Sequence, residues 1–276
     1  MKKINLLVIG FLSGLIGLSS CLKGDTKTSG YVVGVIDYSP YGTTVVRTFT
    51  EYLYGPELSP LIASGEINPG DCYCFYYELD RGAKENSYVM IQANGYLTVS
   101  LTPYEKATIF QATSYLTDTS TVLPNEIPIN NINVSGNDAI SGLTHDYLFF
   151  THSYRAPNNA EVIWDVSYYY YTPHTPIQQT GMWYYDIFFR ARLAEEAGEG
   201  ATFTSKTTFN AYRLEDFLAR VASNEKERLN SIGSYNESSM FTLRLNFPYE
   251  INDSNITWRT ETINIPVYLF DFYGSY

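Results

Sequence analysis

The feature that most constrains this sequence is a series of short runs in which aromatic and β-branched residues alternate with polar ones. The chain has 26 tyrosines but only 18 lysines and arginines together, and Gly, Pro, Asn and Asp separate one run from the next. Such runs suit the pleated, half-buried surface of a β-sheet, whereas an amphipathic helix repeats about every 3.6 residues. The sequence therefore predicts an all-β protein.

The first half of the chain holds five such runs. Asn94-Gly95 fits a tight hairpin turn between the last two of them. Several short strands within so few residues favour a small barrel of the OB type, which we place at residues 30–120. The predicted strands are Tyr31–Tyr38, Thr43–Thr50, Cys72–Leu79, Ser87–Gln92 and Tyr96–Leu101.

The second half, residues 121–276, reads as a β-sandwich with one short helix near residues 213–222. The helix is expected because Leu214, Phe217, Leu218 and Val221 recur at helical spacing. The domain boundary is expected in the irregular stretch 117–131. The predicted strands are His145–His152, Val162–Tyr171, Trp183–Leu193, Thr202–Asn210, Met240–Phe247 and Ile256–Phe270.

The N-terminus has the layout of a secretory leader. Two lysines follow Met1, and a mostly apolar stretch too short to span a bilayer runs to Leu18. The tetrapeptide Leu18-Ser19-Ser20-Cys21 that closes it resembles the lipobox of bacterial lipoproteins, in which the cysteine becomes the lipid-bearing first residue. We therefore expect a signal peptide at residues 1–20, lipidation of Cys21 and a tether at residues 21–29. An ordinary cleaved signal with an incidental cysteine is the alternative.

Two acyl chains or more give stable membrane anchoring. Leu22, in place of aspartate after the cysteine, resembles the signal for delivery to the outer membrane, on either its periplasmic or its cell-surface side. The formal net charge of −11 at pH 7 disfavours nucleic-acid binding and contact with anionic lipid, so the acyl chains must hold the protein to the membrane.

No catalytic or metal-binding set emerges from the sequence, and no cofactor is predicted. Cys72 and Cys74 lie two apart, where a disulfide would be strained, and we expect two reduced strand cysteines. His145 and His152 lie seven apart, so on one regular strand they would point to opposite faces. A cluster around Glu195 and a second one around Glu225 are acidic, but a glycosidase needs two carboxyl groups held across a cleft. A glycan-active enzyme is therefore kept only as an alternative.

The aromatic runs are the best candidates for a binding surface. A strand must place two rings of the run 168–171 on each face, and a second aromatic run follows from Trp183. Rings exposed to solvent suit protein interfaces and sugar stacking alike, whereas buried rings would only stabilise the sheet through cross-strand ladders. The predicted surface residues are Tyr168, Tyr169, Tyr170, Tyr171, Trp183 and Tyr184.

This layout resembles the NigD-like lipoproteins of Bacteroidetes. The resemblance is carried by the lipobox cysteine, by Gly70-Asp71 leading into the strand at Cys72, and by the segments at 146–150, 185–190 and 209–211. It implies an N-terminal OB-like domain followed by a C-terminal β-sandwich. It also suggests bacteriocin immunity, but it transfers no catalytic residue. A fimbrillin-like adhesin subunit is a competing resemblance, although this chain is short for that family.

The function predicted from the sequence is therefore that of an outer-membrane-anchored lipoprotein with a non-catalytic binding or structural role, engaging a protein or a glycan.

Overall fold

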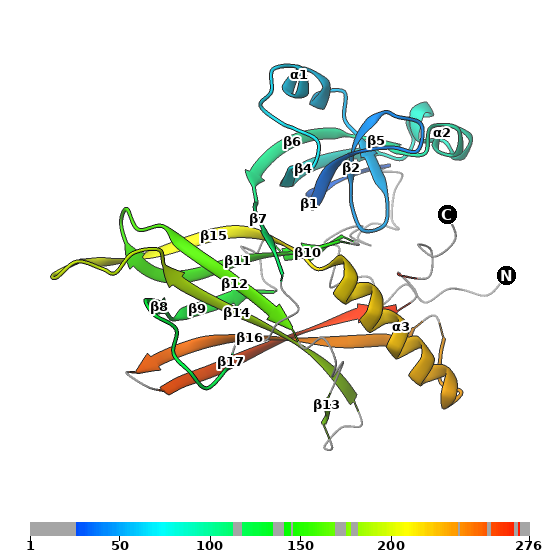
Figure 1. Ribbon diagram of the computed structural model, residues 1–276. Helices are drawn as coiled ribbons and strands as arrows, with labels where there is room; N and C mark the ends of the chain where they lie inside the picture. Colours follow the sequence, from blue (N-terminus) through cyan, green and yellow to red (C-terminus); the bar gives the residue numbers. More distant parts are fainter. Residues whose placement is uncertain are drawn as a thin grey trace. The chain divides into compact units, whose positions relative to one another are not determined.

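Figure 1 shows the computed structural model, which describes residues 26–112, 118–134, 141–144, 146–168, 175–177, 182–236, 238–252, 255–267 and 270. Backbone contacts divide the chain into two units. The first unit holds Met1–Thr108 with Ile140–Phe149, and the second holds Ile109–Ala139 with Phe150–Tyr276. Strands dominate both units, so the predicted all-β class is confirmed.

The first unit is built on a six-stranded sheet in the order β5-β3-β2-β1-β4-β6. β5 and β6 lie at opposite ends of this order, yet only Val99 separates them in the chain. Because one residue spans only about 3.3 Å, the sheet must curl until its ends approach each other, as in a small barrel. The strands are β1 (Lys27–Tyr38), β2 (Thr44–Arg47), β3 (Tyr52–Tyr54), β4 (Cys72–Asp80), β5 (Leu97–Thr98) and β6 (Ser100–Lys106).

The core of the first unit is largely aliphatic. Inward-facing residues of β1 and β4 alternate with outward-facing ones, as the pleat of a strand requires. The short helix α1 (Leu58–Ala63) adds Leu58, which is buried against the same cluster. The main core side chains are Val32, Ile36, Val46, Leu58, Phe75, Tyr77 and Leu101.

Residues 87–92 are not the strand that the sequence predicted. Residues 88–92 lie in the helix α2 (Tyr88–Asn94), and Ser87 connects this helix to the 3₁₀ turn η1 (Lys84–Asn86). Gly95 takes a left-handed conformation with φ of 73°, and its N–H donates to the carbonyl of Ile91. Asn94-Gly95 therefore ends a helix and does not form the predicted hairpin turn. Ile91 packs against the core cluster, and this tertiary contact outweighs the strand preference of its neighbours.

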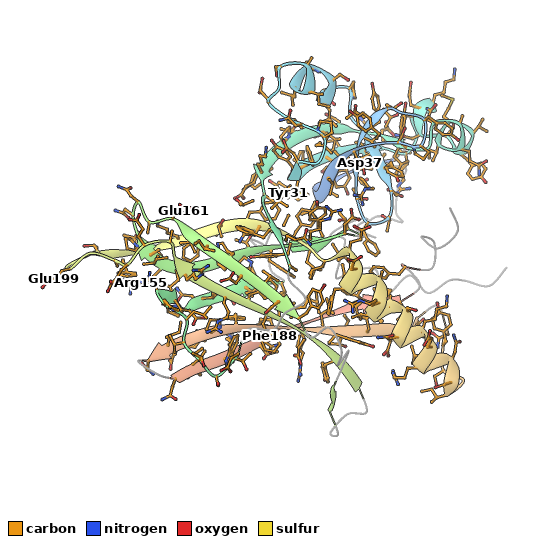
Figure 2. All side chains as sticks on the ribbon, in the orientation of Figure 1. Tyr31, Asp37, Arg155, Glu161, Phe188 and Glu199 are labelled. Atoms are coloured by element: carbon orange, nitrogen blue, oxygen red, sulfur yellow. The ribbon has the colours of Figure 1, made fainter. Side chains whose placement is uncertain are left out.

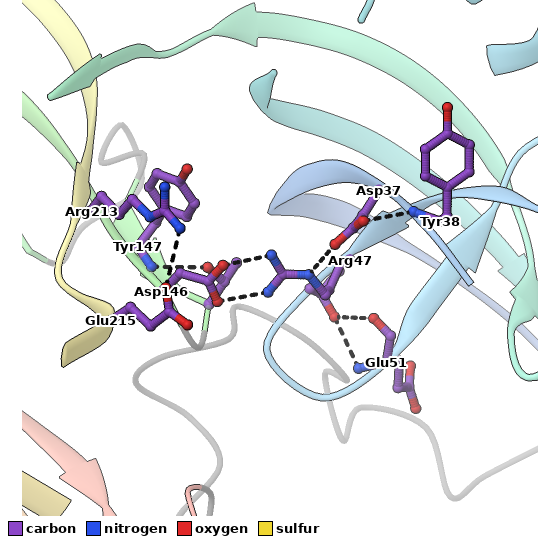
Figure 3. Close-up of polar contacts among 10 residues, drawn as sticks. Asp37, Tyr38, Arg47, Glu51, Asp146, Tyr147, Arg213 and Glu215 are labelled. Atoms are coloured by element: carbon purple, nitrogen blue, oxygen red, sulfur yellow. Dashed lines mark hydrogen bonds and ion pairs between the residues drawn. The ribbon is translucent and has the colours of Figure 1, made fainter. Parts of the chain in front are cut away.

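Residues 140–149 belong to the first unit and not to the second domain, where the sequence pattern predicted them. β10 (Ser141–Leu143) brings Gly142 so close to β1 that an added Cβ would lie 2.2 Å from a methyl carbon of Val33. Arg47 donates to both carboxylate oxygens of Asp146 at 2.9 and 2.8 Å, and its Nε donates to Asp37 at 2.6 Å (Figure 3). Close packing and a bidentate ion pair thus hold this distant segment to β1 and β2.

The second unit contains two sheets. One includes β11 (Tyr147–Pro157), β15 (Phe203–Arg213) and β7 (Thr108–Gln111) in that order, and β9 (Ile129–Asn133) also pairs with β11. The other, which we call the third sheet, has the order β12-β14-β16-β17, while β8 (Glu126–Ile127) and β13 (Thr175–Ile177) also pair with β14. Its main strands are β12 (Val162–Tyr168), β14 (Met182–Leu193), β16 (Met240–Asn252) and β17 (Asn255–Pro266).

Aromatic side chains from these two sheets pack against one another. The ring of Phe189 on β14 lies 6.1 Å from that of Phe150 on β11 and 4.9 Å from that of Tyr212 on β15. Trp164 on β12 contacts the imidazole of His152 on β11, with ring centroids 4.7 Å apart. Contact between the inner faces of two sheets is the packing of a β-sandwich, as the sequence predicted.

The predicted helix exists but is longer than expected, since α3 runs from Glu215 to Ser231. It lies between β15 and β16, and this long connection allows β14 and β16 to pair in parallel. Pro248 lies within β16 at a bulge, beyond the last residue that pairs with β14. Its missing N–H therefore costs no bond to β14.

Candidate functional site

The residues of the predicted aromatic surface lie in different environments. Tyr168 is only 7% exposed and packs on Phe217 of α3 at 4.5 Å between ring centroids, so it is a core residue and not part of a surface. Tyr184 is half-buried, and the guanidinium of Arg244 lies 5.3 Å from its ring centroid. Tyr169, Tyr170, Tyr171 and the side chain of Trp183 lie outside the described residues, as does Cys21.

Tyr184 lies on a face of the third sheet that carries both aromatic and polar side chains. Residues two apart on a strand share a face, and the pairing of β14 with β16 and of β16 with β17 places three such rows side by side. On β14 and β16 the opposite face is apolar and buried, for example at Ile187 and Leu245. We call the first one the outer face; it consists of Tyr184, Asp186, Phe188, Arg244, Asn246, Trp258 and Thr260.

A hydrogen-bonded chain crosses the outer face from β14 to β17. Arg244 forms a two-pronged ion pair with Asp186, and its Nε donates to Oδ1 at 2.6 Å. The amide of Asn246 donates to the same oxygen at 2.8 Å. Thr260 donates to the amide oxygen of Asn246 at 2.7 Å. These bonds fix the guanidinium in one orientation before any ligand arrives.

The guanidinium of Arg244 has hydrogen-bond donors that the ion pair with Asp186 does not use. Its Nε and Nη2 atoms bond to Asp186, while no described residue accepts a hydrogen bond from Nη1. The side chain is 24% exposed, so this nitrogen can reach solvent. A rigid donor beside the ring of Tyr184 suits a ligand that offers oxygen acceptors next to a hydrocarbon surface.

The other end of the outer face is covered by the chain itself. The ring of Trp258 meets that of Phe188 edge-on at 5.6 Å, and its indole N–H donates to the carbonyl of Thr119 at 3.0 Å. Arg190 is buried beneath this segment, where it bonds to Glu126 at 2.5 Å and to two backbone carbonyls. Figure 2 labels Phe188 on β14. Thr260 on β17 is exposed and Tyr184 and Arg244 are partly exposed, so these residues form the accessible part of the outer face.

The titratable groups at the centre of the second unit are structural. His152 is fully buried, its Nε2 lies 2.7 Å from the hydroxyl of Tyr212, and its Nδ1 has no hydrogen-bond partner among the described residues. Desolvation lowers the pKa of His152 to about 3. Glu225 accepts from Tyr185 at 3.0 Å and is ion-paired with Arg228. Both buried groups therefore serve the packing of this unit.

The remaining sequence candidates do not form a reaction centre. Cys72 and Cys74 are free and buried, and burial raises the pKa of each thiol to about 12. Glu195 and Glu199 are exposed, and Figure 2 shows Glu199 at the tip of its loop. No group of three His, Cys, Asp or Glu in the described part of the chain could hold a metal ion. His145 and His174 lie outside the described residues.

Two of the hollows among the described residues are small. A hollow of about 30 Å³ at one end of the first sheet has room for about one water; burial raises the pKa of Glu51 in its wall. A hollow of about 140 Å³ near the start of α3 has a mainly polar lining that contains Arg213 and Glu215, which pair with each other at 3.2 Å.

Comparison with known families identifies the first unit. Residues 24–105 match the family model described as "Lipoprotein OB domain". This segment is an OB domain. The predicted OB fold and the resemblance to a lipoprotein family are thereby confirmed. No helix among the described residues is both long and apolar enough to cross a membrane.

Solved structures extend the likeness to most of the chain. An uncharacterized protein from Parabacteroides merdae is 16% identical, with a TM-score of 0.64 over 86% of this chain and 99% of its own. A Bacteroides vulgatus protein of unknown function is 11% identical, with a TM-score of 0.50 over 86% and 92%. A NigD-like immunity protein from Bacteroides caccae is 9% identical, with a TM-score of 0.40 over 87% and 97%. None of the curated proteins matches this sequence. At these identities the first two likenesses establish the fold alone.

Sequence reasoning found Tyr184 but missed the other six residues of the outer face. Alternation in the run at β14 places Asp186 and Phe188 on the same side as Tyr184, so the sequence pattern could have identified both residues. It could not have identified Arg244, because β14 and β16 pair in parallel across an intervening strand and helix.

Proposed function

We propose that this protein is a lipid-anchored lipoprotein of the outer membrane that binds a saccharide without catalysis, and that the outer face of the third sheet is its binding site. The observation that carries the proposal is the guanidinium of Arg244, held by Asp186 beside the ring of Tyr184 with its Nη1 atom unused by any described residue. Sugars present hydroxyl oxygens around a ring whose C–H groups stack on aromatic side chains, so they match both features. The match of the first unit to a lipoprotein OB domain supports the lipid anchor.

Binding is tested by titrating the chain with a panel of oligosaccharides. We expect Arg244→Lys to weaken binding strongly, because an ammonium group cannot keep the two-pronged pair with Asp186 and still offer a fixed donor. Tyr184→Ala is expected to weaken it as well. Arg192→Lys is the matched control, since Arg192 lies on β14 and pairs with Asp165 at 3.2 Å through a side chain that is 40% exposed. Saturable binding that survives both Arg244→Lys and Tyr184→Ala would refute the site.

Catalysis is tested in the same panel. A binding protein returns the oligosaccharides unchanged. Turnover that falls on Glu→Gln substitution would instead establish an enzyme.

The anchor is tested at Cys21. Cys21→Ser should abolish lipid labelling and release the protein from membranes, whereas Cys72→Ser should leave labelling intact because Cys72 is a buried strand residue. Separation of the inner and outer membranes tests the location. A Cys21→Ser variant that still fractionates with the outer membrane would contradict the anchoring mechanism.

A further inference from the structure

The strand β17 leaves one side of its backbone without a partner among the described residues. It is the last strand in the order β12-β14-β16-β17, and all of its register pairs are with β16. No backbone hydrogen bond from another described segment reaches residues 255–266. Figure 1 shows β17 along the edge of the sheet, with β16 between it and β14. An edge of 12 residues is long for one that carries no bulge or internal proline of its own.

The side chains along this edge are self-complementary. Arg259 and Glu261 lie two residues apart on the same face, with Thr260 between them on the other face. In antiparallel pairing of two identical strands about a two-fold axis at Thr260, residue 259 of one copy lies opposite residue 261 of the other. Each Arg259 then meets a Glu261, and this occurs twice in the pair.

The neighbouring registers are unfavourable. When the two-fold axis, perpendicular to the sheet, passes through position 259, the Arg259 side chains of the two copies lie opposite each other. When it passes through position 261, the two Glu261 side chains lie opposite each other. Like charges directly across an antiparallel pair are destabilising, so the charges select the register centred on Thr260.

Both charged side chains are available for this pairing. Arg259 and Glu261 are 48% and 29% exposed, and their mutual contact at 3.3 Å is a surface ion pair that water screens. Thr260 and Thr262 are exposed or partly exposed as well.

From these observations we propose that two copies of this chain associate through antiparallel β17–β17 pairing, with the two-fold axis at Thr260. The inference is independent of the saccharide-binding proposal. The pairing extends the third sheet across both copies and places their two outer faces side by side, with Thr260 from each copy at the centre.

A single cysteine tests the register in the full-length, membrane-bound protein. Residues directly opposite each other in an antiparallel pair have Cα atoms about 4.5–5.5 Å apart, which a disulfide can bridge. Thr260→Cys should therefore give a disulfide-linked dimer after mild oxidation of membranes, seen on a non-reducing gel. Thr262→Cys is the matched control on the same face, because its Cα would lie roughly 14 Å from its counterpart.

Charge exchange in the Thr260→Cys background tests the pairing chemistry. Arg259→Glu would set a carboxylate at position 259 against Glu261 of the other copy, and Glu261→Arg would set a guanidinium at position 261 against Arg259. Each variant should lower the dimer fraction several-fold. Co-expression of the two variants, carrying different tags, should restore cross-linking between them, since every opposed pair is then of unlike charge. A general loss of folding would not be repaired by mixing.

The proposal is overturned by stronger cross-linking at Thr262→Cys than at Thr260→Cys, by cross-linking of Thr260→Cys to a different protein, or by equal dimer fractions for all charge variants. Absence of any dimer from Thr260→Cys in a protein that is folded and membrane-bound would overturn it as well.

Discussion

The two units of this protein differ in what fills their interiors. The OB domain has a largely aliphatic core around Val32, Ile36 and Leu101, and its strong ion pair, Arg47 with Asp146, lies outside that core. The second unit buries charge instead: Arg190 with Glu126, and Glu225 with Arg228. The first unit should therefore respond mainly to changes in packing, whereas the second should respond to changes in protonation and charge.

This difference can be measured separately in each unit. The chain has three tryptophans, at positions 164, 183 and 258, and all belong to the second unit. Tryptophan fluorescence therefore follows the second unit alone, while hydrogen exchange of β1 and β4 follows the OB domain.

The largest effect is expected for Glu126→Gln. Arg190 is 2% exposed and would lose its only carboxylate partner among the described residues. An uncompensated buried charge costs about 3–5 kcal/mol of the free energy of unfolding. Urea unfolding followed by tryptophan fluorescence measures this loss. Asp165→Asn, which removes the exposed partner of Arg192, should cost less than about 1 kcal/mol. Similar losses for both variants would contradict the contrast between buried and exposed pairs.

Acid should destabilise the second unit through His152. Its pKa in the folded protein, about 3, is lower than the 6.5 of a free histidine, so the unfolded chain binds the proton more readily. The stability contributed by neutral His152 is present above pH 6.5 and is lost as the pH falls toward 3. At pH 4.5 the loss amounts to about 3 kcal/mol.

Urea midpoints between pH 7 and 4.5 test this effect. His152→Phe keeps a ring in the aromatic cluster and should flatten the pH dependence relative to the wild-type chain. An unchanged slope in His152→Phe would assign the acid sensitivity to other groups.

Packing should dominate the OB domain, as Gly142→Ala would show. The new Cβ would lie 2.2 Å from Cγ2 of Val33 and 3.5 Å from its Cβ, so one of the two segments must shift. Overpacking of this kind costs about 1–3 kcal/mol. Hydrogen exchange in β1 should accelerate, and Val33→Ala in the same chain should restore part of the protection. Additive losses in the double variant would argue against direct contact.

The smallest effect is expected at Glu199, which lies on an exposed loop. Glu199→Gln should change the unfolding free energy by less than about 0.5 kcal/mol, because the carboxylate is already solvated. A larger change in the urea midpoint would show that surface charge, and not only buried charge, controls the second unit.

The sequence predicted the elements whose pattern is local. Alternation located the strands at Tyr31, Cys72 and Met240, and helical spacing located the start of α3. It failed where distant contacts decide the conformation. Ile91 packs on the core and makes residues 88–94 helical, and Arg47 and Val33 hold residues 140–149 in the first unit.

The candidate site shows the same limit. Tyr184 was recognisable as an aromatic residue on a strand. Asp186 orients Arg244, but the two residues lie on strands that are not consecutive in the chain. No short-range sequence pattern predicts that these two strands pair. The buried histidine was visible as a residue, but its aromatic surroundings come from three other strands.

The return of residues 140–149 to the first unit also constrains the order in which the chain can mature. During synthesis the N-terminal residues emerge first, yet Val33 and Arg47 find their partners only after Gly142 and Asp146 have followed. The sheet and core of the OB domain lie within residues 27–106 and can form early, but the contacts that cover β1 are delayed until residues 109–139 of the second unit have been synthesised. Truncations that stop at residue 108 or 120 should expose an apolar strip of β1 and behave as late folding intermediates.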